Sequence, residues 1–224
     1  QRVGHPINML TIDADEVGEH PNLIEGIIAT DYTGIVVRNA LSETVVSTAI
    51  AAMQAEATDQ FWTSPNTGMK GGEIRTIGDA ATPTFTAFRG PTAERYGRSA
   101  RDHQVWHDVI FGDLSPTPQL QRVFSELFGG RPAHPPTFDE TTEWLPYNCR
   151  ALDPGIQIYS HHDNHYGLDI YQHLDDCYDR STLMSWFVTL QPAETDGELV
   201  IYGLWGSDPN PPMLPTRFMD TAAL

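Results

Sequence analysis

The sequence predicts an α+β fold in a single domain, with helices in the N-terminal part and a β-sandwich or barrel in the C-terminal half. Apolar residues recur at helical spacing within 42–53 and 117–129, each with start or stop signals. After the proline-rich stretch 129–137, strand-like segments follow one another at 147–163, 181–190 and 197–205. The 224 residues suffice for one sizeable core with a helical layer around it.

The first elements read as a short strand followed by a helix. Three β-branched residues at 35–37 favour an extended segment. Ser42 suits a helix N-cap, and the apolar spacing then continues through Met53. We therefore expect a strand, a short turn and a helix in this order.

A second pair of helices is expected further along the chain. Residues 98–112 favour one helix. A better-marked helix follows, with Thr117 as its cap, Pro118 at its first position and Gly129 as its stop.

Between these helical parts lies a segment rich in glycine, proline and threonine, residues 64–91. It carries brief extended pieces around Ile74 and Phe85, so we expect loops and short strands that act as a lid or pocket wall. Arg89 in this segment is a candidate anchor for an acidic substrate, although a surface ion pair is the commoner role for an arginine in so acidic a chain.

The charge and composition of the chain limit the classes of molecule that it can bind. A net charge of −17 argues against nucleic acid, because phosphates would be repelled. No apolar run is long enough to cross a membrane, and no signal-peptide pattern is present. Cys149 and Cys177 do not form a disulfide framework. We expect a cytoplasmic protein that acts on a small molecule, without nucleic-acid or membrane partners, and its oligomeric state stays open.

The stretch DPGIQIYSHHDNHYG, residues 153–167, contains four potential metal ligands. If a strand continues to Asp163, alternation places four polar side chains on one face: Gln157, Tyr159, His161 and Asp163. His161 and Asp163 can then converge on one ion, while His162 points away. An imidazole with a carboxylate suits a divalent first-row metal, and such ligand sets hold non-haem Fe(II).

The stretch 153–163 resembles the Fe(II)/2-oxoglutarate-dependent dioxygenases, including their prolyl hydroxylase-like branch. In that superfamily a Pro-Gly turn is followed by five residues of strand and then by His-x-Asp, the spacing found here from Pro154-Gly155 to His161. Downstream, residues 181–205 are similar to the superfamily's hairpin, with Asp196-Gly197 suited to its tight turn. The resemblance covers about residues 144–206 of the chain.

The resemblance implies a double-stranded β-helix (jelly roll) core, with the N-terminal helices packed against it. The helical and loop part would span about residues 1–140, and the jelly-roll strands would begin at about residue 144 and be incomplete at residue 224. It implies Fe(II), 2-oxoglutarate and O₂ as cofactor and co-substrates. The implied reaction is hydroxylation of an unactivated C–H of an amino-acid derivative or natural-product intermediate.

The same resemblance assigns residues. His161 and Asp163 would hold the iron, with a further histidine and a basic residue for 2-oxoglutarate expected beyond residue 224. Arg150 lies eleven residues before His161, where some members place a polar contact to 2-oxoglutarate; a salt bridge at a strand end is the alternative. Gln157 and Tyr159 would line the co-substrate pocket, although an inward tyrosine is also ordinary core.

Other functions stay open. A non-catalytic jelly-roll binding protein is one, and the same enzyme class performing desaturation, cyclisation or epimerisation is another. Halogenation is disfavoured, because related halogenases carry Gly or Ala where Asp163 stands, which frees a metal position for chloride. The tripeptide His165-Tyr166-Gly167 has that pattern but breaks the five-residue spacing from the Pro-Gly turn.

Overall fold

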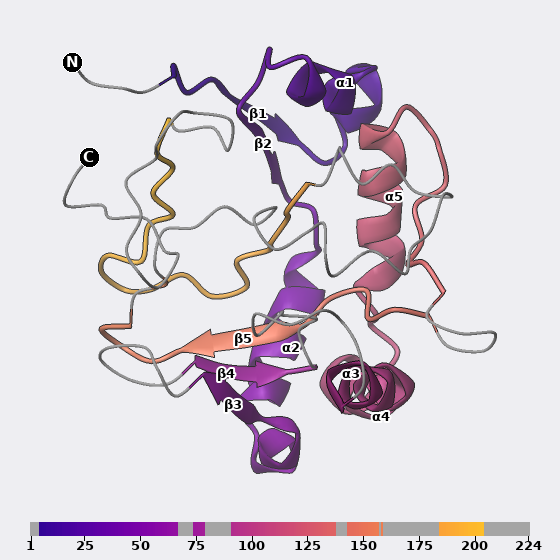
Figure 1. The fold of residues 1–224 in the computed structure, drawn as a ribbon, viewed down its shortest axis with the longest axis vertical. Coiled ribbons are helices and arrows are strands. Elements are labelled where there is room, and N and C mark those ends of the chain that lie inside the picture. The colour runs from indigo at the N-terminus through magenta and orange to yellow at the C-terminus, as the bar shows by residue number, and fades with distance from the viewer. Residues whose placement is uncertain are drawn as a thin grey trace.

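The fold was analysed in a computed structural model, which describes residues 5–66, 74–78, 91–137, 143–156, 158 and 184–203 (Figure 1). In chain order its elements are β1 (Met9–Asp13), η1 (Val17–Glu19), α1 (Leu23–Ile28), β2 (Gly34–Arg38), α2 (Glu43–Met53), η2 (Glu56–Phe61), β3 (Thr63–Asn66), β4 (Ile74–Ile77), α3 (Pro91–Arg101), α4 (His103–Phe111), α5 (Thr117–Leu127) and β5 (Cys149–Leu152), where η denotes a 3-10 helix.

The N-terminal unit is a β-α-β arrangement. Strands β1 and β2 pair in parallel, from Met9 opposite Gly34 to Asp13 opposite Arg38, and α1 lies on the connection between them. Helix α5 packs on this unit, and together they bury one apolar cluster: Ile12, Ala14, Val17, Leu23, Ile24, Val123 and Leu127.

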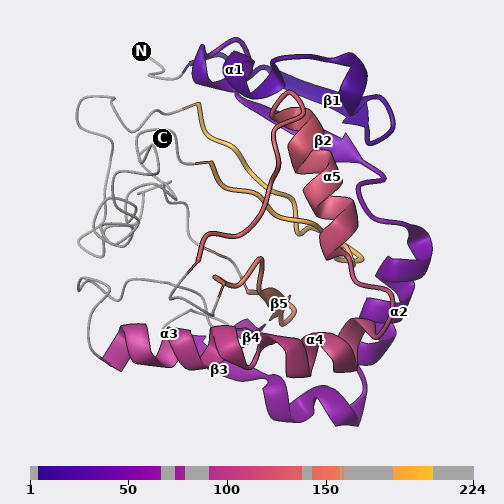
Figure 2. The same ribbon diagram turned by 90° about the vertical axis from the view of Figure 1, so that its right-hand side faces the viewer.

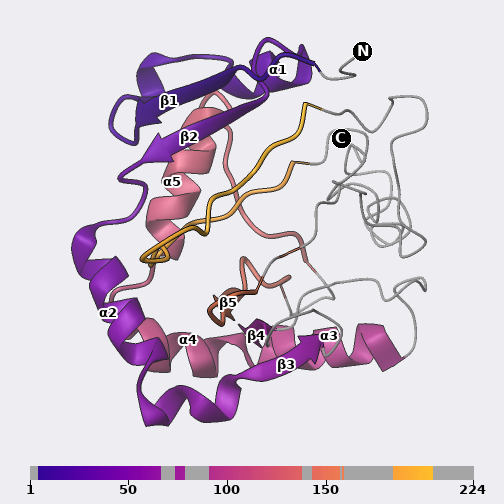
Figure 3. The same cartoon turned by 90° about the vertical axis from the view of Figure 1, so that its left-hand side faces the viewer.

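The second unit is an antiparallel sheet with the order β3-β4-β5. Helices α2 and α4 cover one face of it, and the views in Figures 2 and 3 place both helices beside these strands. This face and the two helices share the second apolar cluster: Val45, Ala49, Ile77, Trp106, Ile110, Phe111 and Cys149. Helices α2 and α4 therefore anchor the sheet from this side.

Helix α5 connects the two units. The backbone N–H of Ser42, just before α2, donates to the side-chain oxygen of Gln119 on α5 at 2.9 Å. Further along α5, the ring of Phe124 meets that of Trp186 edge to face, with centroids 5.0 Å apart. Figure 2 shows the segment 184–203, in orange to yellow, passing beside α5.

The helix signals of the sequence are largely confirmed. The hydroxyl of Ser42 accepts a hydrogen bond from the Val45 N–H, as expected of an N-cap, and α2 ends at Met53. Gly129 has φ +67°, and its N–H and that of Gly130 bond to the carbonyls of Glu126 and Ser125, which closes α5 in a Schellman motif.

The cap predicted for α5 is wrong by one residue. Thr117 is the first helical residue and Pro116 is the cap. The Thr117 N–H donates to the Ser115 hydroxyl, and the Thr117 hydroxyl lies 3.5 Å from that of Tyr147. The Thr117 side chain, which was expected to cap the helix, therefore contacts Tyr147, a residue distant in sequence.

The order of elements also differs from the expectation of helices first and strands later. Among the described residues, four of the five strands precede α3, and β1, β3 and the helix α1 were not predicted. The extended piece around Ile74 is confirmed as β4, whereas the one around Phe85 lies outside the described residues. The predicted helix 98–112 is present as α4 and the end of α3, which begins at Pro91.

The tight turn predicted at Asp196-Gly197 has a suitable backbone, whereas the strand pairing of the hairpin stays a prediction. Asp196 and Gly197 have φ of +56° and +82°, and a type I′ hairpin turn needs positive φ at both central positions. Within 184–203 the structure shows no strand pairing. The complete jelly roll therefore stays a prediction. No helix in the described parts of the chain has the length and apolar character needed to cross a membrane.

An aromatic cluster lies on α4 beside the segment that leads into β5. It comprises His103, Trp106, His107, Phe111 and Tyr147, with ring centroids 4.6 to 6.4 Å apart. Burial lowers the pKa of His103 to about 4, and the neighbouring His107 adds to this shift while Asp108 opposes it. Burial likewise lowers the pKa of His107. Both histidines are therefore neutral at pH 7.

We expect this cluster to make the fold sensitive to acid. The unfolded chain takes up a proton on His103 near pH 6.5, whereas the folded chain does so only near pH 4. The free energy of unfolding should therefore be highest above pH 6.5 and fall by about 2 kcal/mol towards pH 4, after allowance for partial exposure. Urea denaturation across this range measures it. The free energy of unfolding of His103→Leu should depend less on pH than that of the unchanged protein. The control variant His134→Leu, at an exposed position, should have the same pH dependence as the unchanged protein. Equal pH dependence in all three proteins would contradict this role of His103.

Candidate functional site

Of the six residues predicted to form the site, Arg150 lies in the described part of the chain. The other five are outside it: Arg89, Gln157, Tyr159, His161 and Asp163. His162 and His165 are outside it as well. The structure therefore describes the strand that leads to the predicted metal ligands and the residues around Arg150.

The Pro-Gly turn of the motif is present. The Ile156 N–H donates to the Asp153 carbonyl at 3.1 Å, and Gly155 has φ +83°. Proline at the second position of a turn and a residue of positive φ at the third define a type II turn. Glycine adopts this φ without strain, which explains the Pro154-Gly155 pair. The chain thus turns sharply between β5 and the segment that carries His161 and Asp163.

Strands β4 and β5 present two different faces. Ile77 lies opposite Cys149, and both are buried under α2 and α4. Residues alternate along a strand, so Thr76 and Arg150, which also lie opposite each other, are on the other face. Thr76 is buried and Arg150 is exposed. The polar neighbours therefore lie on the face turned away from the helices, which would be the inner face if the predicted barrel forms.

Arg150 is held by a side chain two residues earlier. Its Nε donates to the Oδ1 of Asn148 at 3.0 Å. No further hydrogen bond or ion pair joins its two terminal nitrogens to another described residue. A guanidinium held through Nε can bind a carboxylate with these two amino groups through two parallel hydrogen bonds.

Asn148 is itself placed by a close approach of the two strand ends. Gly78 follows β4 with φ +77°, and a Cβ at this position would lie 3.2 Å from the Trp106 ring and 3.6 Å from the Cα and Cβ of Asn148. Trp106 is 4% exposed and belongs to the cluster under the sheet. Trp106 on α4 and Asn148, whose side chain binds Arg150, thus both lie close to Gly78.

Two neighbouring groups are unsuited to chemistry at neutral pH. Burial raises the pKa of the Cys149 thiol to about 12, so it stays protonated. Burial also raises the pKa of Tyr147 above its usual value, with the Thr117 hydroxyl opposing the shift. Cys149 is thus a structural thiol.

The described residues contain no group of three His, Cys, Asp or Glu side chains that could hold a metal ion. The donor set His161 and Asp163, imidazole with carboxylate, fits a divalent iron by its chemistry. Any iron site of this chain must therefore draw on residues outside the described ranges.

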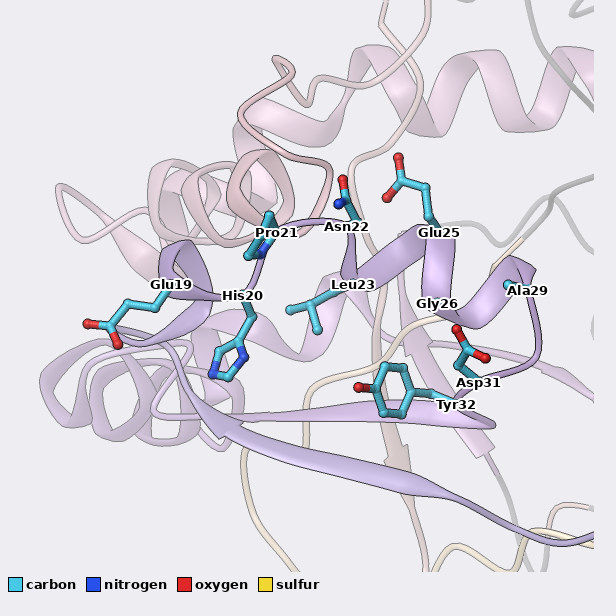
Figure 4. A pocket seen from close by; sticks show the side chains of 10 residues that line it. All are labelled: Glu19, His20, Pro21, Asn22, Leu23, Glu25, Gly26, Ala29, Asp31 and Tyr32. Atoms are coloured by element: carbon cyan, nitrogen blue, oxygen red, sulfur yellow. The ribbon is translucent and has the colours of Figure 1, made fainter.

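A pocket of about 390 Å³ lies elsewhere, lined by residues between Glu19 and Tyr32 from η1, α1 and their flanking loops (Figure 4). Its lining residues include Glu19, Glu25, Asp31 and Tyr32. None of the predicted site residues contributes to it. Figure 1 shows α1 at the opposite end of the molecule from β4 and β5, so this pocket is separate from the candidate site.

Asn148 and Thr76 were missed by the sequence interpretation. Asn148 could have been found from alternation, because residues two apart on a strand share a face and an amide can hold a guanidinium. Thr76 could not, because its place beside Arg150 depends on the pairing of two strands that are about 70 residues apart in sequence.

Comparison with known families gives one result. A family model described as the carrier-protein-independent halogenase WelO5 matches residues 6–217. A comparison with curated proteins finds no match to this chain. The family match covers both the helical part and the predicted jelly-roll part, including every residue predicted for the site.

We expect Gly78→Ala to lower the free energy of unfolding by about 2–3 kcal/mol, because it adds crowding against Trp106 to the cost of a positive φ. Gly129→Ala is the matched control, since Gly129 has a similar φ of +67° but nothing within 4 Å of its added Cβ. That variant should lose only about 1 kcal/mol. Chemical denaturation of both measures the difference. Equal losses would show that the contact with Trp106 and Asn148 is not tight.

Proposed function

The chain belongs to the WelO5 family of carrier-protein-independent halogenases, and from this premise we propose that it hydroxylates an unactivated C–H of a free small molecule. The family is part of the Fe(II)/2-oxoglutarate oxygenase superfamily, so the resemblance identified in the sequence is confirmed. Dependence on Fe(II), 2-oxoglutarate and O₂ is confirmed with it. The description of the family names halogenation, and hydroxylation is therefore our proposal for this member.

One feature of the sequence supports the proposal: a carboxylate stands where the superfamily's His-x-Asp motif has its metal ligand. Asp163 follows His161 by two residues, at the expected spacing from a Pro-Gly pair whose turn geometry the structure describes. A carboxylate at this position would fill the place at the metal that chloride needs. We therefore assign His161 and Asp163 as two of the iron ligands.

The overall reaction balances for hydroxylation. With iron bound, 2-oxoglutarate and O₂ supply an oxidant that abstracts a hydrogen atom from the substrate. One oxygen atom of O₂ enters succinate, formed with loss of CO₂, and the other enters the substrate as a hydroxyl group. The protein's own task is to bind the substrate C–H close to the metal and to exclude water and other reductants.

Several side chains have proposed roles around the metal. Arg150 is assigned to a carboxylate of 2-oxoglutarate, which its hold through Nε alone among the described residues and its place on the face away from the helices support. Gln157 and Tyr159 share the ligand face by alternation and would line the same pocket. Arg89 would contact an acidic substrate. The family's independence of a carrier protein supports a free small molecule as that substrate.

Halogenation is the second candidate, because the family's description names it. Gly167 two residues after His165 has the residue pattern of a halogenase ligand site. The alternative of a non-catalytic jelly-roll protein gains no support from membership in an enzyme family. Desaturation and cyclisation remain alternatives within the same chemistry, because substrate placement decides between them.

Replacing His161 by Ala should remove iron binding and lower succinate formation by more than about a hundredfold. Loss of a group that merely hydrogen-bonds to a metal ligand already lowers metal affinity or activity by up to about a hundredfold. His162→Ala is the matched control and should keep the iron content, because alternation turns His162 to the other face. Metal analysis of both variants and succinate assays measure the effect. Full turnover by His161→Ala would refute the ligand assignment, and loss of iron in His162→Ala would refute the assumed register.

The product formed in chloride-containing buffer separates the two candidate reactions. We expect the unchanged protein, supplied with Fe(II), 2-oxoglutarate, O₂ and candidate amino-acid derivatives, to give a product heavier by one oxygen atom. Mass spectrometry of the reaction mixture detects it. A product that has gained chlorine in place of hydrogen would establish halogenation and overturn the argument from Asp163, and a loss of two hydrogen atoms would indicate desaturation or ring closure.

A further inference from the structure

We propose that Asn148 is a positioning residue for Arg150: it fixes the guanidinium group so that its terminal nitrogens can bind a carboxylate of 2-oxoglutarate. The inference rests on the proposed role of Arg150 and adds a residue that the sequence interpretation did not single out. It concerns the binding of the co-substrate and is independent of whether the product is hydroxylated or halogenated.

The geometry of the pair supports this role. Asn148 accepts from Nε, the one guanidinium nitrogen within the side-chain stem, at 3.0 Å. The bond leaves the two terminal nitrogens unused and restricts rotation of the guanidinium plane. A planar group held in one orientation loses less entropy when it binds a carboxylate through two hydrogen bonds.

The surroundings keep Asn148 in place. It is half-buried, whereas Arg150 is exposed. Its backbone lies against the position of Gly78, where a Cβ would be 3.6 Å away, and the same position contacts the buried Trp106 ring. The end of the pair near α4 is therefore anchored in the packed part of the molecule, and the guanidinium end is accessible.

The charge of the protein makes such an anchor necessary. A chain with a net charge of −17 repels the 2-oxoglutarate dianion at long range. Local binding then depends on arginines without a carboxylate partner. Arg122 forms an ion pair with Glu126 at 3.1 Å and Arg75 lies over the Trp62 ring at 5.2 Å, whereas Arg150 is held by a neutral amide and has no carboxylate partner among the described residues.

Arg75 provides a matched control within the same sheet. It lies on β4 opposite Ala151, next to the Thr76–Arg150 pair in the ladder, but on the other face. Arg75→Ala removes the same charge from a neighbouring position without touching the proposed carboxylate site. The affinity for 2-oxoglutarate should therefore respond to Arg150 and not to Arg75.

The test is a double-mutant cycle on 2-oxoglutarate binding, measured by calorimetry on the full chain loaded with Mn(II) so that no turnover occurs. We expect Arg150→Ala to weaken binding about tenfold or more, Asn148→Ala about fivefold, and Arg75→Ala hardly at all. In the Arg150→Ala background, Asn148→Ala should have no further effect, because Asn148 acts through Arg150. The nearly isosteric Asn148→Asp should also weaken binding, since its carboxylate would neutralise the guanidinium and repel the ligand.

Each other result has a distinct meaning. Additive losses in the double variant, or unchanged affinity in both Asn148 variants, would overturn the positioning role. Unchanged affinity in Arg150→Ala would remove Arg150 from the co-substrate site and the inference with it. Absence of 2-oxoglutarate binding by the unchanged protein would contradict the proposed function itself. A chlorinated product together with the expected cycle would refute hydroxylation and leave the role of Asn148 intact.

Discussion

The pairing of β4 with β5 is the constraint on which the candidate site depends. These strands lie about 70 residues apart in the chain, and their register places Ile77 opposite Cys149 and Thr76 opposite Arg150. The first pair is buried under α2 and α4, so a slip of one residue would bring a polar pair into that apolar cluster. Burial on the helical face therefore determines which side chains lie on the other face.

The helices serve the site through this apolar cluster. Trp106 on α4 packs among the residues of the cluster and also against the position of Gly78, next to Asn148. The aromatic cluster on α4 extends this packing to the segment before β5. Burial keeps its two histidines, His103 and His107, uncharged at pH 7. The strand that leads to the predicted metal ligands thus starts from a rigid, helix-backed support, as precise placement of a site requires.

Family membership and the chain's own residues carry different parts of the functional argument. The family match over 6–217 shows the cofactor class. In the proposed function, the choice of reaction depends on one side chain, because a carboxylate at position 163 and a chloride ion would compete for the same place at the metal. A family description and a member's chemistry can differ in this way when a single ligand position decides the outcome.

The sequence by itself determined the local features whose physical cause is local. The Ser42 cap, the Gly129 stop and the Asp196-Gly197 turn each follow from the conformational preference of one or two residues, and all three are present. The His-x-Asp spacing identified the superfamily for the same reason, since it depends on one turn and one strand. Short strands without a clear apolar period, such as β1 and β3, were missed because pairing with a partner strand, and not their own residue pattern, stabilises them. The tertiary structure alone decided that Thr117 contacts Tyr147, which displaced the expected cap of α5. It alone decided that Arg150 lies beside Thr76, on the face away from the helices, because strand register follows from which residues the helices bury.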